Sequence, residues 1–183
     1  MKLYCKLFSL VIILLVCVMS ISGCASPAAT RDGMLVNRFV SNQQLSSKSV
    51  NVNVVGIYED APLHLTRAVI PFSELKSAIE SSLVDNQIFS QIVDNKLADY
   101  LLTCVIFGMD SKGGGEVTDN IEIAWILKNL KNNETVWKES IKSSKTLSIS
   151  DEFIGLKRKR LTTENAVRIN LKQAILAMSK LSL

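Results

Sequence analysis

The stretch YLLTCVIFGM, from Tyr100 to Met109, decides the fold of this chain of 183 residues. Its apolar side chains fall on both alternating faces, with one face carrying Leu101, Val105 and Phe107 and the other Tyr100, Leu102, Cys104 and Ile106. A strand that is apolar on both faces is typical of the interior of a sheet, where other elements cover it. We therefore predict a central strand covered on both sides.

Two further strands follow this one. Apolar and polar residues first alternate, the apolar ones being Ile121, Ile123, Trp125 and Leu127, which predicts a strand with one buried face. The chain then turns at Lys131–Asn133 into a last strand around 135–142. A two-residue turn would place Trp137 opposite Lys128, whereas a three-residue turn places it opposite Leu127. We favour three residues and a bulge, because this register keeps the apolar groups together.

One strand and two helices complete the predicted elements. Val50, Val52 and Val54 alternate with Asn51 and Asn53, which indicates a half-buried strand. A helix opens at Pro71–Ser73 with Ser73 as its N-cap, and a second is capped near Thr162 or Thr163 and carries Asn170 on its apolar stripe. The order predicts an α+β fold: a two-layer sandwich whose mainly antiparallel sheet of about four strands packs two helices on one face.

The N-terminal residues have the composition of a targeting segment and not of a folded domain. Lys2 and Lys6 precede an apolar run from Leu7 to Ile21, which is too short for a spanning helix of roughly 20 residues and is typical of a secretory signal. The run ends in Ile21-Ser22-Gly23-Cys24. These four residues resemble the lipobox of bacterial lipoproteins; an ordinary secretory cleavage site with a chance cysteine is the alternative.

That resemblance implies a covalent lipid anchor. In the family, signal peptidase II cuts before the cysteine, here between Gly23 and Cys24, and Cys24 becomes a diacylglyceryl cysteine whose amino group often carries a further acyl chain such as palmitate. Ala25, in place of an aspartate, implies the outer membrane of a two-membrane host, with the domain facing the periplasm. Two or three acyl chains hold a protein in a membrane essentially permanently.

The expected organisation has three parts. Residues 1–23 form the cleaved signal peptide, residues 24–36 the lipidated cysteine and a flexible tether, and residues 37–183 a single periplasmic domain. Cys104 is then the one unmodified cysteine, so no intramolecular disulfide forms. Its apolar neighbours indicate burial and not reactivity. The chain carries 21 basic and 17 acidic residues, a balance that argues against nucleic acid as a partner.

A second resemblance covers the domain itself, from about Pro71 to Leu181. The segments that carry it include Asp99-Tyr100-Leu101, Trp125, Trp137 and Asn165-Ala166-Val167-Arg168-Ile169-Asn170. They look like those of small periplasmic lipoproteins with an α/β sandwich, among them the LPS-assembly lipoprotein, LpoB-type activators of penicillin-binding proteins and auxiliary lipoproteins of ABC transporters. The resemblance implies the fold and not one member's function.

Catalytic signatures are sparse and each has a structural explanation. Ser73 and Lys76 match the S-x-x-K motif of penicillin-recognising enzymes, but its K-T-G companion is absent and a helix cap explains Ser73 better. His64 is the single histidine and has no partner at metal-ligand spacing. We expect neither a metal nor a cofactor, and we expect Gly113–Gly115 to form a hairpin tip.

The sequence therefore favours a non-enzymatic binding or assembly module of the cell envelope, with an envelope protein as its partner. Our candidate contacts are Tyr100, Leu102, Ile106, Ile169, Leu176 and the basic run Lys157, Arg158, Lys159 and Arg160. The run would bind anionic head groups or an acidic surface, or else form a solvated flank that Asp151 and Glu152 neutralise. A lipid or glycolipid carrier for an ABC transporter, with a closed apolar pocket, is the alternative. A hydrolase dependent on Ser73 or His64 is the third.

Overall fold

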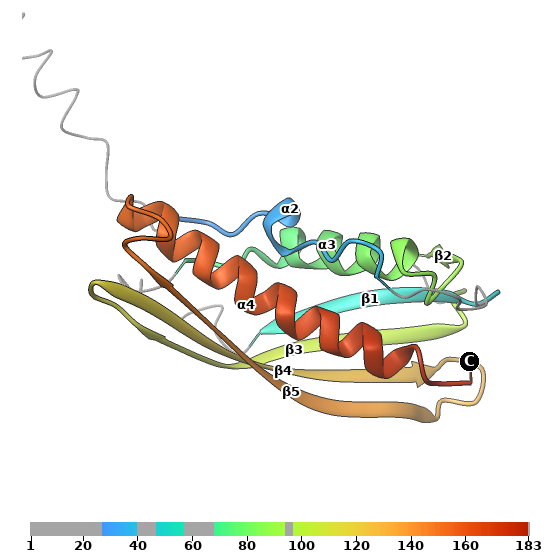
Figure 1. The fold of residues 1–183 in the computed structure, drawn as a ribbon. Helices are drawn as coiled ribbons and strands as arrows, with labels where there is room; N and C mark the ends of the chain where they lie inside the picture. The colour runs from blue at the N-terminus through green and yellow to red at the C-terminus, as the bar shows by residue number, and fades with distance from the viewer. Residues whose placement is uncertain (1–26, 40–46, 57–67, 94–96, 183) are drawn as a thin grey trace, which may run out of the picture.

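The computed structural model describes residues 27–39, 47–56, 68–93 and 97–182, and Figure 1 shows their arrangement. The strands, labelled as in Figure 1, are β1 (Ser49–Gly56), β2 (Gln91–Ile92), β3 (Tyr100–Lys112), β4 (Glu116–Asn129) and β5 (Thr135–Ser148). The helices are α2 (Arg31–Met34), α3 (Phe72–Asp85) and α4 (Gly155–Met178). One sheet in the order β2-β1-β3-β4-β5 carries these helices on one face (Figure 1).

The sheet is mixed. Strands β3, β4 and β5 are antiparallel neighbours, while β1 pairs in parallel with both β2 and β3. The α+β class and the helices on one face are confirmed. The expected count of about four strands and two helices is too low, because the two-residue β2 and the single-turn α2 are too short to leave a periodic pattern. The parallel pairs arise because the connection from β1 runs through α3, which returns the chain to the same end of the sheet.

The core lies between the sheet and the helices. Leu102 and Cys104 on β3 and Trp125 on β4 are fully buried there. The opposite face of β3, with Leu101, Val105 and Phe107, is only half-buried. We expected other elements to cover both faces of this strand. That expectation is wrong, because all the described helices lie on one side of the sheet.

The β4–β5 turn has four residues, 130–133, and not the predicted three, since Lys128 pairs with Thr135 and the backbone N–H of Asn129 donates to the carbonyl of Glu134. Leu127 pairs with Trp137, and a register shift between Leu127 and Lys128 marks the bulge. Asn133 adopts a φ of 64°, a left-handed conformation that asparagine tolerates better than most residues. The register prediction is confirmed, and it keeps Trp137 partly buried against the core.

Helix α4 starts earlier than predicted. It begins at Gly155, so Thr162 and Thr163 lie inside the helix, where their hydroxyls donate to the carbonyls of Arg158 (2.8 Å) and Lys159 (3.1 Å). Threonine commonly bonds to the preceding turn in this way, and a cap and such a bond look alike in the sequence. The basic run is thus part of the first turns of α4. Ser73 does not cap α3 either, since Pro71 holds that position.

Candidate functional site

The N-terminal segment 27–39 packs against the helices. Ala29, Met34 and Val36 are buried in the main core. The expected flexible tether over 24–36 is therefore wrong from Pro27 onward, and the domain begins about ten residues earlier than predicted. Residues 25–33 are small and polar on average, and the apolar residues that follow, Met34, Leu35 and Val36, show no helical or strand periodicity.

Partly buried polar contacts fix this segment to α4 and α3. The Glu164 carboxylate, nearly inaccessible to solvent, accepts bonds from the backbone N–H (2.9 Å) and the hydroxyl (2.8 Å) of Thr30. Arg168 donates to the carbonyl of Gly33, and Glu74 on α3 accepts from the backbone N–H of Arg31 at 2.8 Å. We call these contacts the N-terminal clamp.

Gly33 belongs to the clamp for a steric reason. A Cβ atom built on it would lie 2.0 Å from Cδ of Glu164, far inside van der Waals contact. Any side chain would push the carboxylate away from Thr30. Glycine at this position lets the backbone approach α4 closely.

Segment 27–39 runs alongside α4 in the same direction. Thr30 meets Glu164, Gly33 meets Arg168, and the ring of Phe39 lies 4.8 Å from Nζ of Lys172. Continued backwards by three residues, this register brings the start of the described chain level with the first turns of α4. Figure 1 shows the blue start of the chain on that side of α2.

The same end of the molecule carries a group of exposed apolar side chains. It comprises Ile149, Phe153, Ile154 and Leu156, from the β5–α4 connection and the first turn of α4. Phe153 is 84% exposed, which is unusual for so large an apolar side chain. The β3–β4 hairpin reaches this group as well, since a Cβ on Gly115 would contact Ile149 at 3.9 Å. We call the group the apolar corner.

Two carboxylates adjoin the apolar corner, and both are engaged by its own loop. Asp151 accepts from the backbone N–H and the hydroxyl of Ser148, each at 2.8 Å. Glu152 pairs with Nζ of Lys157 at 2.7 Å and accepts from the N–H of Ile154 at 3.1 Å. Hydrogen bonds to Ser148 lower the pKa of Asp151, and the bond to Lys157 lowers that of Glu152.

The basic run does not form a free cationic patch. Besides the paired Lys157, Arg158 is buried and donates to the carbonyl of Glu152 at 2.6 Å, and Nε of Arg160 lies 3.7 Å from the Glu164 carboxylate. Arg158 is thus a structural residue and not a surface contact. Its burial follows from the start of α4 at Gly155, which turns this position toward the loop.

Three more predicted contact residues face the core. Tyr100, Leu102 and Ile106 are buried on the helix side of β3, so their selection as surface contacts is wrong. Pairing with Trp125 and Ile123 sets that face, since directly paired residues point to the same side of a sheet. The half-buried alternate residues are the ones that face outward. Ile169 and Leu176 on α4 are exposed, as the prediction required.

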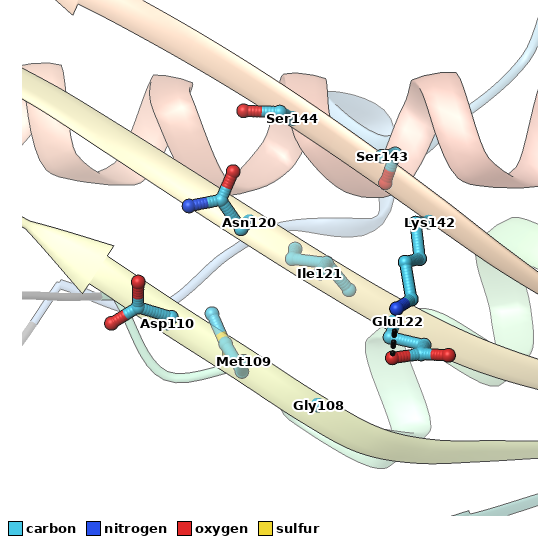
Figure 2. Close-up of a pocket in the computed structure, with 9 residues that line it drawn as sticks. All are labelled: Gly108, Met109, Asp110, Asn120, Ile121, Glu122, Lys142, Ser143 and Ser144. Atoms are coloured by element: carbon cyan, nitrogen blue, oxygen red, sulfur yellow. Dashed lines mark ion pairs between the residues drawn. The ribbon is translucent and has the colours of Figure 1, made fainter.

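An open depression of about 390 Å³ lies across β3, β4 and β5 (Figure 2). The register places Gly108, Glu122 and Lys142 on the sheet face opposite the helices, at the bulge between Ile106 and Gly108. Figure 2 shows Lys142 directed at Glu122, 3.5 Å away. This depression is open and has a charged rim, unlike the closed apolar pocket that a lipid carrier needs.

Several predicted residues need separate mention. Ile21–Cys24, including the cleavage position Gly23, and His64 lie outside the described residues. Ser73 is exposed, and Lys76 pairs with Glu80 at 3.5 Å. Cys104 is buried as predicted, and burial raises the pKa of its thiol. In the part of the chain that the structure describes, no helix is long and apolar enough to cross a membrane.

Comparison with known proteins shows the fold. No family model and no curated protein sequence matches the chain. Among solved structures, a Xanthomonas campestris protein described as DUF330 is similar with a TM-score of 0.60 and 11% identity, covering 77% of this chain and 89% of that one. The hypothetical protein CT253 of Chlamydia trachomatis follows with 0.51, 8% identity, and coverage of 73% and 98%.

A structure described as uncharacterized lipoprotein B of Nitrosomonas europaea has a TM-score of 0.49 and 12% identity, covering 79% of this chain and 91% of that one. The Xanthomonas and Chlamydia structures share the fold of this chain. At such low identity, shared architecture says nothing about function.

Proposed function

We propose that this chain is a lipoprotein of the bacterial envelope, anchored through acylated Cys24, whose domain is a non-enzymatic binding or assembly module. The lipobox-like sequence Ile21–Cys24 at the end of an apolar run supports the anchor. Ala25 supports an outer-membrane location facing the periplasm.

The N-terminal clamp is the observation that carries this proposal. Thr30 is fixed to Glu164, and Ala29 is already buried, only five residues after Cys24. A domain locked so close to its lipid anchor is held at the membrane in a restricted orientation, with the start of α4 towards the bilayer. Such an arrangement suits a module that presents a surface to a partner at a set distance from the membrane.

The free edge of the sheet is the surface that we assign to the partner. Among the described residues, β5 (14 residues) pairs with β4 alone and forms an edge of the sheet, where Asn170 of α4 engages the carbonyl of Ile141. An exposed edge of this kind binds extended segments by strand addition. Lys138 and Lys142 lie on its outward face and favour a partner segment with acidic side chains, and Lys142 also lines the depression.

The polar groups of the core form hydrogen bonds that hold elements of the fold together. Asn170 bonds to Trp125, Thr163 bonds to Asp119, and Glu164 holds Thr30. A general acid, base or nucleophile has to reach a substrate. Because these polar groups are bonded to one another, they support a binding role over a catalytic one.

In-cell photo-crosslinking tests the assignment of the partner surface. A photo-reactive residue at Lys138, on β5, is expected to capture one discrete envelope protein, because its side chain projects from the outward face. The same residue at Gln173, exposed on α4, is the matched control. Equal capture from both positions, or none from position 138, would contradict the assignment.

A Cys24→Ala variant tests the anchor separately. It is expected to leave the membrane fraction, while the unchanged chain stays there after a high-salt wash. Persistence of the variant in the membrane, with an unmodified thiol in the natural protein, would reject the lipid anchor.

A further inference from the structure

We infer that the apolar corner is a second membrane contact, which inserts into the head-group region of the leaflet that holds the acylated Cys24. This inference rests on the proposed function, since it takes the lipid anchor as its starting point. It adds a protein surface that binds phospholipid directly and fixes how the domain sits on the bilayer.

The reach of the anchor places the bilayer at this end of the molecule. Pro27 is the third residue after Cys24, and a fully extended chain over these three steps spans about 11 Å. Thr30 contacts Glu164, so continuing the chain backwards to Pro27 leads to about the level of Arg160, in the first turns of α4. From there, the start of α4 is five residues, or about 7.5 Å, farther along the helix axis.

The chemistry of the apolar corner suits an interface with lipid. Phe153, Ile154 and Leu156 are each more than half exposed and follow one another closely in the chain. The adjacent acids accept bonds from Ser148 and Lys157, and Asp151 stays exposed beside the apolar side chains. Side chains of this kind enter the boundary between head groups and acyl chains, while a flanking lysine keeps its charge in water.

A protein partner fits the same surface less well. A single α-helix is about 10 to 12 Å across, which already fills the distance that the extended chain permits between Pro27 and the lipid. The bilayer itself needs no such space. The short distance between Pro27 and the lipid therefore favours lipid over a second copy or another protein at the apolar corner.

Spin labelling of the lipidated full-length product tests the inference. A nitroxide is attached at Phe153→Cys in protein purified from a Gram-negative host and reconstituted into vesicles of phosphatidylethanolamine and phosphatidylglycerol. Val136→Cys is the matched control, since Val136 is also apolar and exposed but lies near the β4–β5 turn at the opposite end. Cys104 is buried and Cys24 acylated, so the new thiol is the one that reacts.

We expect the ratio of relaxation by oxygen to relaxation by a water-soluble nickel complex to be several-fold higher at position 153 than at position 136. A position 153 as accessible to nickel as position 136, with acylated Cys24 in the mass spectrum, overturns the membrane contact and leaves the anchor intact. Protection of position 153 from both reagents identifies a protein contact and also overturns it. An unmodified Cys24 refutes the proposed function and the inference together.

Discussion

Trp125 on β4 donates its indole N–H to the side-chain oxygen of Asn170 on α4 across 2.9 Å, and both residues are fully buried. The amide of Asn170 in turn donates to the carbonyl of Ile141 on β5 at 2.7 Å. One side chain therefore ties the last helix to two strands. Because a buried polar group without a partner is costly, these bonds also fix the rotation of α4 about its axis.

Replacement of Asn170 by leucine should lower the free energy of unfolding by about 2–4 kcal/mol, because it leaves the Trp125 N–H and the Ile141 carbonyl without partners. Urea denaturation followed by tryptophan fluorescence measures the change. Gln173→Leu, on the exposed side of the same helix, is the control and should shift the midpoint little. A change for Asn170→Leu no larger than that of the control would contradict the assigned bonds.

A Gly33→Ala substitution should weaken the N-terminal clamp. The new Cβ would clash with the Glu164 carboxylate and displace it from Thr30, at an expected cost of about 1–3 kcal/mol. Amide hydrogen exchange of residues 29–36 reports the loosening directly. Gly115→Ala, where the new Cβ meets nothing closer than 3.9 Å, is the matched control. Unchanged protection in the Gly33 variant would show that the clamp does not depend on this contact.

Asp99 makes part of the stability depend on pH. Hydrogen bonds from Ser49 and from Lys131 lower the pKa of its carboxyl group from 3.8 to about 2. A lowered native pKa means that the contribution is complete above the unfolded value and is lost as pH falls toward 2. Solvent screens this partly exposed site, so we expect a loss of about 1 kcal/mol between pH 5 and pH 2.

Asp99→Asn should flatten this part of the stability profile. Thermal unfolding of both proteins across the acid range gives the comparison, and Asp32→Asn, an exposed carboxyl near the N-terminal clamp, is the control. Identical acid dependence of Asp99→Asn and the unchanged protein would reject the role of the Ser49 and Lys131 contacts.

Replacement of Lys142 should reduce partner binding with little effect on stability. Its ion pair with Glu122 is exposed, so Lys142→Ala should change the free energy of unfolding by less than about 1 kcal/mol. The same substitution removes a cation beside the β5 edge and should reduce crosslinking from position 138. Undiminished capture would show that charge at the depression does not contribute to the partner surface.

The sequence predicts the elements that repeat a period over many residues. Alternation through β4 and β5 gave the correct Leu127–Trp137 register, and helical spacing gave the buried stripe of α4 with Asn170 on it. Both follow from one buried face, because a shift by one residue would expose the whole set.

Sequence patterns could not predict the elements that depend on individual tertiary contacts. The segment at Thr30 is ordered by Glu164, more than a hundred residues away, and no local pattern records that bond. The faces of β3 were likewise ambiguous, because both are apolar and the choice depends on pairing with β4. The apolar corner was missed for a related reason: a short apolar stretch looks the same whether it is buried or exposed.

The central claim is the lipid at Cys24, and mass spectrometry of the protein extracted from its native membranes tests it most directly. The account predicts an N-terminal peptide that begins at Cys24 and carries the mass of a diacylglyceryl group with or without a further acyl chain. A mature N-terminus at any other residue, or a free thiol on Cys24, would contradict it.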